Sequence, residues 1–148
     1  MSEYAFNRRA QFDYEMLEKF EAGIALLGFE VKAVKSGRVS IGASYVVFKK
    51  AEPYLINADI SPYQPLNTPQ DYDSKRSRKL LLKKSEIKYL FGKKESAGLT
   101  IVPIKIYNKK NRIKLEIALA RGKKKYEKRE KIKKREANRK IEKAAKNY

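Results

Sequence analysis

The chain has 148 residues, of which 36 are Lys or Arg and 17 are Asp or Glu, so its formal net charge is +19. It has no histidine, which excludes every Ser–His or Cys–His nucleophile pair, and no cysteine, which excludes disulfides and thiolate metal sites. We therefore expect a cytoplasmic protein without catalytic residues, cofactor or metal, whose positive charge is neutralised by a polyanion such as a phosphate backbone.

The first half of the chain is predicted to form strands around one helix. Apolar side chains recur at every second position over Phe12–Ile24, except at Glu18, which indicates a strand with one buried face. A helix is predicted over Leu27–Val34, with Ser36-Gly37 as its stop signal. Further strands, with Gly42–Ser44 as a turn between the first two, are predicted at Val39–Ile41, Tyr45–Lys49 and Tyr54–Ile60.

An irregular segment and a second helix are predicted next. Ser61–Ser77 contains three prolines among Asp, Asn and Ser residues, a composition typical of a long loop. Arg78–Phe91 has leucines at helical spacing, and Gly92 follows it. We therefore predict a helix from Arg78 that ends at Gly92.

The last two predicted strands, Leu99–Tyr107 and Arg112–Ala120, form a hairpin through Asn108–Asn111. Pro103 in the first of them requires an edge position or a bulge. Five or six strands with two to three helices indicate a mainly β (α+β) domain over residues 1–121. An antiparallel, OB-like β-barrel is the economical choice, because such barrels present strands and loops to RNA. The periodicity of the apolar residues alone does not distinguish this barrel from an α+β sandwich.

A basic tail, residues 122–148, follows the boundary near Arg121-Gly122. Residues 121–148 hold fourteen Lys or Arg and four Glu, so they contribute +10 to the net charge. The tail has too few bulky apolar residues to fold alone, and we expect it to be disordered in the free protein. Each Glu precedes a Lys by four residues, which stabilises a helix by ~0.2–0.5 kcal/mol per pair and predicts folding on a partner. The alternative is a tail that stays solvated. The pairs are Glu127–Lys131, Glu130–Lys134, Glu136–Lys140 and Glu142–Lys146.

Clusters of basic residues mark candidate RNA-binding positions in the body. Each cluster alone is more often a solvated face, but together with the tail they predict one positive surface. Glu21 alternates with buried-type residues and is expected to face the polar side, as a counter-ion or as an acceptor for base amino groups. The basic candidates are Arg8, Arg9, Arg78, Lys79, Lys109 and Lys110.

Six sequence blocks, in order along the chain, resemble those of the small protein B family, the SsrA RNA (tmRNA)-binding proteins of bacteria. No single block is diagnostic, but six in order are highly specific. Glu127-Lys128-Arg129 stands where the family usually has Asp-Lys-Arg. The blocks are Asn7–Ala10, Phe20–Ile24, Gly28–Lys32, Arg76–Leu82 with Glu86-Ile87, Gly98–Pro103 and Ala118–Lys124.

This resemblance implies an OB-like barrel that binds the tRNA-like part of tmRNA and takes part in trans-translation on stalled ribosomes. It further implies a tail that lies as a helix in the empty mRNA channel and decoding site of the small subunit, against ribosomal RNA. Elongation factor Tu is expected as a partner through alanyl-tmRNA, and the protein itself is expected to be a monomer. By motif, Asn7, Glu21, Leu81 and Lys114 fall where the family contacts tmRNA.

The same resemblance implies that the tail engages the ribosome. Gly122, Lys123 and Lys124, with the Lys128-Arg129 pair, fall at the family's ribosome-engaging positions. The remaining tail residues that we expect to take part are Lys133, Lys134, Arg135 and Ile141.

Two other functions are open on the residues alone. A ribosomal or general RNA-chaperone protein would carry a similar charge. A metal-dependent nuclease using Asp13, Glu21 or Glu30 would need only carboxylates. A membrane role is not expected, because no segment approaches the ~20 apolar residues of a spanning helix and no apolar signal segment follows the N-terminus.

Overall fold

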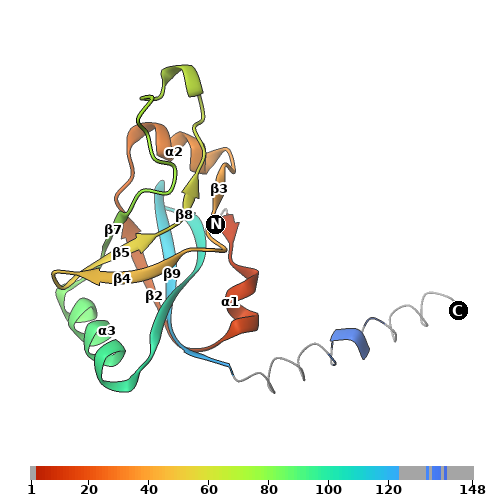
Figure 1. Cartoon of the computed structure of the whole chain (residues 1–148), viewed down its shortest axis with the longest axis vertical. Coiled ribbons are helices and arrows are strands. Elements are labelled where there is room, and N and C mark those ends of the chain that lie inside the picture. The colour runs from red at the N-terminus through yellow and green to blue at the C-terminus, as the bar shows by residue number, and fades with distance from the viewer. Residues whose placement is uncertain (1–2, 124–132, 134, 138, 140–148) are drawn as a thin grey trace, which may run out of the picture.

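The computed structural model describes residues 3–123, 133, 135–137 and 139. Figure 1 shows long, curved strands crossed by shorter ones, with helices at the periphery. The first elements in the chain are β1 (Glu3–Phe6), α1 (Arg8–Asp13), β2 (Tyr14–Ile24), α2 (Gly28–Lys35), β3 (Val39–Ser40) and β4 (Tyr45–Lys49). They are followed by β5 (Glu52–Ile56), β6 (Asp59–Ile60), the 3-10 turn η1 (Pro65–Asn67), β7 (Arg78–Leu81), α3 (Lys84–Ala97), β8 (Thr100–Lys109) and β9 (Arg112–Gly122).

Seven strands form one antiparallel sheet in the order β1-β8-β9-β2-β7-β5-β4. The sheet curls on itself, because β4 at one end contacts β8, which is next to the other end. The short strands β3 and β6 pair separately. This architecture confirms the predicted mainly β class with a few helices.

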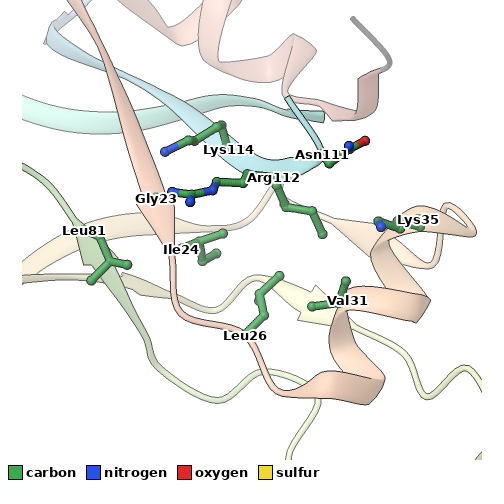
Figure 2. Close-up of a pocket in the computed structure, with 10 residues that line it drawn as sticks. Gly23, Ile24, Leu26, Val31, Lys35, Leu81, Asn111, Arg112 and Lys114 are labelled. Atoms are coloured by element: carbon green, nitrogen blue, oxygen red, sulfur yellow. The ribbon is translucent and has the colours of Figure 1, made fainter. Parts of the chain in front are cut away.

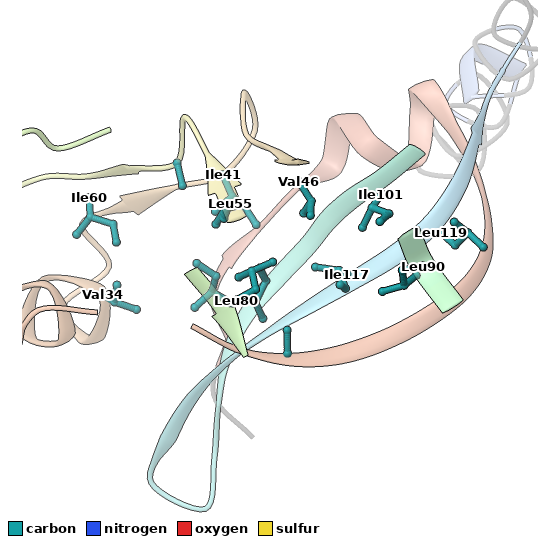
Figure 3. Close-up of a cluster of buried hydrophobic side chains, with 14 of the residues drawn as sticks. Val34, Ile41, Val46, Leu55, Ile60, Leu80, Leu90, Ile101, Ile117 and Leu119 are labelled. Atoms are coloured by element: carbon teal, nitrogen blue, oxygen red, sulfur yellow. The ribbon is translucent and has the colours of Figure 1, made fainter. Parts of the chain in front are cut away.

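The curled sheet encloses an apolar core to which the helices contribute few residues (Figure 3). Each of the two longer helices buries only a small part of its surface. α2 contributes Ala33 and Val34, and α3 contributes Leu90. Burying an aliphatic side chain of this size contributes about 1.5–3 kcal/mol, so the strands supply most of the stabilisation. Most of the core comes from Ile41, Val46, Leu55, Ile60, Leu80, Ile101, Ile106, Leu115, Ile117 and Leu119.

Local signals in the sequence match the turns of the fold. The break at Glu18 coincides with a register shift between Met16 and Glu18 in β2. Pro103 lies at a bulge of β8, and β8 is not an edge, because it pairs with β1 and β9. The β8–β9 hairpin turns at Lys110 and Asn111, whose φ values of 50° and 62° are those of a type I′ turn.

The predicted helix from Arg78 to Phe91 is wrong at both ends. Arg78–Leu81 is strand β7, in which buried and exposed side chains alternate, and the helix begins only at Lys84. Leu80–Leu82 are compatible with the period of a strand as well as with that of a helix. The segment Arg78–Leu81 forms a strand because it pairs with β2 and β5. Helix α3 continues through Gly92 to Ala97, and Gly98, with a φ of +63°, caps its C-terminal end.

The ends of the body also differ from expectation. Phe12 and Asp13 belong to helix α1 instead of the first long strand, and β1 precedes them. Gly122 is the last residue of β9 and pairs with Tyr14. The backbone N–H of Lys123 donates to the carbonyl of Asp13 at 2.9 Å. The contacts of the body therefore reach Gly122 and Lys123, next to the expected boundary near Arg121-Gly122.

Candidate nucleic-acid interface

Three residues predicted to contact RNA lie side by side on the outer face of the sheet, although they are far apart in the sequence. Leu81 of β7 is paired with Gly23 of β2, and Gly23 is paired with Lys114 of β9. Glu21 lies two residues from Gly23 on β2 and therefore points to the same side. The register thus brings Glu21, Leu81 and Lys114 together.

Gly23 lets the side chain of Leu81 lie across the strand. A Cβ atom at position 23 would lie 3.2 Å from Cβ of Leu81, closer than most real contacts of this kind. Leu81 is 55% exposed, so a large apolar side chain is presented to solvent at this point. An isolated glycine within a strand often marks such a close approach. Gly23 therefore belongs to the interface although it has no side chain.

A hollow opens beside this row of residues (Figure 2). Its apolar lining comes from the end of β2 and the residues that follow it, from α2, from β7 and from β9. Its cationic lining comes from Lys35 at the end of α2 and from Arg112 and Lys114 on β9. The apolar lining residues are Ile24, Leu26, Val31, Leu81 and Ile113.

Three cations at this hollow have no ionic partner in the part of the chain that the structure describes. Lys35, Arg112 and Lys114 form no ion pair there within 4.0 Å. By contrast, Lys79 on the same face binds Glu52 at 3.2 Å. Unpaired cations around an apolar floor suit a ligand that combines phosphate groups with flat, apolar rings.

Glu21 is an ionised carboxylate held by two neighbours. Oε2 accepts a short hydrogen bond from the Tyr107 hydroxyl and one from Nζ of Lys109 at 3.2 Å. The hydrogen bond from Tyr107 lowers the pKa of Glu21 most, against the opposing effect of burial. The hydrogen bond from Lys109 and the positive charges of Lys109 and Lys114 lower this pKa further. The charge of Lys109 is therefore partly neutralised within the protein.

The predicted role of Asn7 as an RNA contact is corrected by its burial. Asn7 is only 4% exposed, and its side chain caps helix α1 by accepting the N–H of Ala10 at 3.2 Å. Its amide also donates to the carbonyl of Pro103 at 2.9 Å. Both polar groups are used within the fold, so Asn7 orients α1 instead of facing a ligand.

Arg78 is likewise corrected from an RNA-binding residue to an internal one. Its side chain is fully buried and forms an ion pair with the buried carboxylate of Glu30 at 2.5 Å. It also donates to the carbonyl of Ala58 at 2.7 Å and to that of Ser74 at 2.9 Å. A guanidinium without solvent contact cannot reach a phosphate. The sequence did not reveal this, because Arg78 and Glu30 are 48 residues apart.

Arg8 and Arg9 are exposed on α1 and line a second hollow with residues from the tail. Arg9 forms an ion pair with Asp13 at 3.3 Å. The guanidinium of Arg135 lies 6.0 Å from the centre of the Phe12 ring, within cation–π range. The structure thus places Arg8, Arg9 and Arg135 together. The remaining residues that line this second hollow are Phe6, Gln11, Phe12 and Arg139.

The other predicted residues are distributed as follows. Lys110 is exposed in the hairpin turn, and Nζ of Lys123 donates to the carbonyl of Gln11 at 3.0 Å. Lys133, like Arg135, has helical backbone. Lys124, Lys128, Arg129, Lys134 and Ile141 lie outside the described residues.

At the first hollow and its border, sequence reasoning did not assign Gly23, Lys35 and Tyr107 to RNA binding. The isolated glycine within the Phe20–Ile24 strand was a usable signal for Gly23. Arg112 lay within a basic cluster at the hairpin. No local pattern connects Lys35 or Tyr107 with the interface, because both reach it only through the fold.

The three carboxylates of the nuclease hypothesis do not form a metal site. Glu30 is buried against two arginines, and Glu21 is bound by Tyr107 and Lys109. No group of three or more Asp or Glu residues able to hold a metal is found within the described part of the chain. Among those same residues, no helix is long and apolar enough to cross a membrane.

Comparisons with known proteins agree on one family. The family model described as SmpB protein matches residues 4–147. The SsrA-binding protein of Carboxydothermus hydrogenoformans is 51% identical over 140 residues, covering 95% of this chain and 93% of that protein. That of Trichodesmium erythraeum is 46% identical over 142 residues, covering 96% and 91%.

A solved structure gives the same result for the fold. A chain from the structure described as "tmRNA-SmpB: a journey to the center of the bacterial ribosome" is 49% identical to this chain. It matches with a TM-score of 0.65 and covers 81% of this chain and 84% of its own length.

Proposed function

The chain belongs to the SmpB protein family, and on that premise we propose that it binds the tRNA-like part of tmRNA and delivers it to stalled ribosomes for trans-translation. The relatives are named SsrA-binding proteins, and the similar solved structure has the description "tmRNA-SmpB: a journey to the center of the bacterial ribosome". RNA binding and ribosome rescue are thus the function of the molecule.

One observation of this chain carries the proposal. Leu81, Gly23 and Lys114 form a row across three strands, with Glu21 alongside, beside a hollow with an apolar floor and unpaired cations. The cations supply sites for phosphates, and the apolar side chains supply surfaces for bases. We assign the outer face of β7, β2 and β9 to the tRNA-like part of tmRNA.

The tail is proposed to engage the ribosome. Gly122 and Lys123 anchor its start to the body, so the rest of the tail leaves from a defined point. The basic residues beyond it, with their Glu–Lys pairs four residues apart, favour a helix when ribosomal RNA neutralises the other faces. In this proposal the tail occupies the empty mRNA channel and the decoding region.

The proposal also covers partners and place of action. Elongation factor Tu would meet the protein through alanyl-tmRNA, and the protein would act as a cytoplasmic monomer. It would contribute no catalytic residue, because its task is to position an RNA on the ribosome, where peptidyl transfer takes place.

Filter binding with two RNAs of similar length tests the binding function. We expect the chain to bind the tRNA-like part of tmRNA more tightly than an elongator tRNA at physiological salt. Affinity for tmRNA should fall steeply as salt rises, because phosphate contacts release counterions. Equal affinity for the two RNAs would contradict the specific proposal and leave a general RNA-binding protein.

Two lysines of helix α2 provide a matched pair for locating the interface. Lys35 lines the first hollow, whereas Lys32 lies on the same helix, is also exposed and lines a hollow with Phe29 and Tyr63. We expect Lys35→Ala to weaken tmRNA binding and to lower the salt slope by about one, and Lys32→Ala to change neither. If Lys35→Ala and Lys32→Ala changed tmRNA affinity equally, the RNA would not bind at the first hollow.

A further inference from the structure

We infer that Tyr107 is a positioning residue for RNA recognition: its hydroxyl orients the Glu21 carboxylate to accept a hydrogen bond from a donor group of the bound RNA. The inference rests on the proposed function, because it concerns the same face of the sheet. It adds to the proposed function the kind of RNA group that Glu21 binds, a hydrogen-bond donor. It also names Tyr107 as the residue that holds Glu21 in place for this contact.

Tyr107 is more buried, and so has less conformational freedom, than Glu21. Tyr107 is buried, with 4% of the residue exposed, and its backbone is paired with Lys114. Nζ of Lys105 lies 5.5 Å from the centre of its ring. The Glu21 side chain is 36% exposed, so by itself it would sample several rotamers. The hydroxyl of a buried tyrosine that donates to a partly exposed carboxylate therefore fixes the carboxylate, and not the reverse.

The two neighbours of Glu21 leave one acceptor position open. An ionised carboxylate has about four acceptor positions, two on each oxygen. Tyr107 and Lys109 both donate to Oε2, and Lys109 also approaches Oε1 at 3.3 Å. Within the described residues, Oε1 receives no other hydrogen bond. One position on Oε1 is left for a ligand.

The charge of Glu21 selects the kind of group that fits there. A carboxylate repels a phosphate, so the RNA must meet it with a hydrogen-bond donor. Unpaired RNA offers three kinds of donor: the exocyclic amino groups and the ring N–H groups of its bases, and the 2′-hydroxyls of its riboses. Lys109 and Lys114 beside Glu21 offer cations for the adjoining phosphates. In this arrangement Glu21 accepts a hydrogen bond from a donor group of the RNA, while Lys109 and Lys114 bind the neighbouring phosphates.

A double-mutant cycle on binding to the tRNA-like part of tmRNA tests this inference. Tyr107→Phe removes the hydroxyl and keeps the ring, and Glu21→Gln replaces one acceptor oxygen by a donor. We expect each single variant to bind about tenfold more weakly, the scale of one lost hydrogen bond to a charged group. We expect the double variant to be no weaker than Glu21→Gln, because Tyr107 acts through Glu21.

Two further measurements separate positioning from a phosphate contact and from damage to the fold. The salt slope of binding should be unchanged in Tyr107→Phe and lower by about one in Lys114→Ala. The thermal midpoint of Tyr107→Phe should stay within a few degrees of the wild type, since the ring is retained. Repeating the cycle on RNA with 2′-deoxyribose at unpaired nucleotides identifies the donor. If the Glu21→Gln effect is lost, the donor is a 2′-hydroxyl; if it persists, the donor is an N–H group of a base.

Three results would overturn the inference while leaving the proposed function intact. They are wild-type affinity in Tyr107→Phe, a full additional loss when Tyr107→Phe is added to Glu21→Gln, and a salt slope lowered by Tyr107→Phe. A wild-type chain without preference for tmRNA would refute the proposed function and, with it, the inference.

Discussion

Glu30 links helix α2 to strand β7, and its replacement by Gln should destabilise the fold. Its carboxylate is fully buried and forms ion pairs with Arg76 and Arg78. It also accepts the hydroxyl of Tyr72 at 2.8 Å and the backbone N–H of Leu27 at 2.8 Å. These contacts tie the long loop before β7 to α2. In Glu30→Gln the buried guanidinium of Arg78 would lose its counter-ion.

The size of the effect follows from the pKa of Glu30. Burial acts to raise this pKa, but the hydrogen bonds from Arg76, Leu27, Arg78 and Tyr72 outweigh it and lower the pKa from 4.5 to about 2. At about 1.4 kcal/mol per pH unit, the difference corresponds to about 3 kcal/mol of folding stability. Breaking a buried ion pair by removing one partner costs a similar ~3–5 kcal/mol.

The pH range of this contribution follows from the sign of the pKa change. Because the folded state has the lower pKa, the stabilisation is complete above pH 4.5 and is lost as the pH falls from 4.5 towards 2. We therefore expect the free energy of unfolding of the wild type to exceed that of Glu30→Gln by about 3 kcal/mol at pH 7. The difference should shrink over that acidic interval.

Urea denaturation at several pH values measures this difference. Glu52→Gln is the matched control, because Glu52 pairs with Lys79 at 3.2 Å while both side chains are about half exposed. An exposed pair of this kind contributes ~0–1 kcal/mol, so the control should unfold almost as the wild type does. If Glu30→Gln and Glu52→Gln behaved alike, or if the Glu30→Gln difference stayed constant between pH 4.5 and 2, the reasoning would be refuted.

Three other predictions concern the body, the interface and the tail. Asn7→Ala should lower the free energy of unfolding by about 1 kcal/mol through loss of the α1 cap, as measured in urea; unchanged stability would contradict that role. Gly23→Val should displace Leu81 and weaken tmRNA binding several-fold in filter assays, and wild-type affinity would argue against contact at this row. Truncation after Lys123 should preserve tmRNA binding and abolish tagging on stalled ribosomes; tagging by the truncated chain would refute the division of labour between body and tail.

Residue patterns predicted those parts of the fold that depend on neighbours in the chain. The alternation along β2, the stop after α2 and the β8–β9 hairpin each arise from contacts within a few residues. The helix predicted from Arg78 was wrong because its leucines fit two periods, and only pairing with β2 and β5 decides between them. Local periodicity cannot report a distant partner strand.

The candidate interface was predicted in part by the same logic. Glu21, Leu81 and Lys114 came from the family resemblance, and the register of three strands places them together. Asn7 was assigned to the interface by the family resemblance, and Arg78 by its place in a basic cluster, since charged residues are mostly exposed. Their partners, Pro103 and Glu30, lie 96 and 48 residues away, so their burial could not be read from the local sequence.

The sequence by itself determined the charge of the chain, its family and the alternation of its main strands, because these depend on composition and on short-range order. The tertiary structure alone decided which polar groups are used internally and which face a ligand. It buries Arg78 against Glu30, fixes Glu21 against Tyr107 and leaves Lys114 unpaired among the described residues. The physical reason is that burial and ion pairing are properties of groups brought together by sheet register, and register is set by the whole domain.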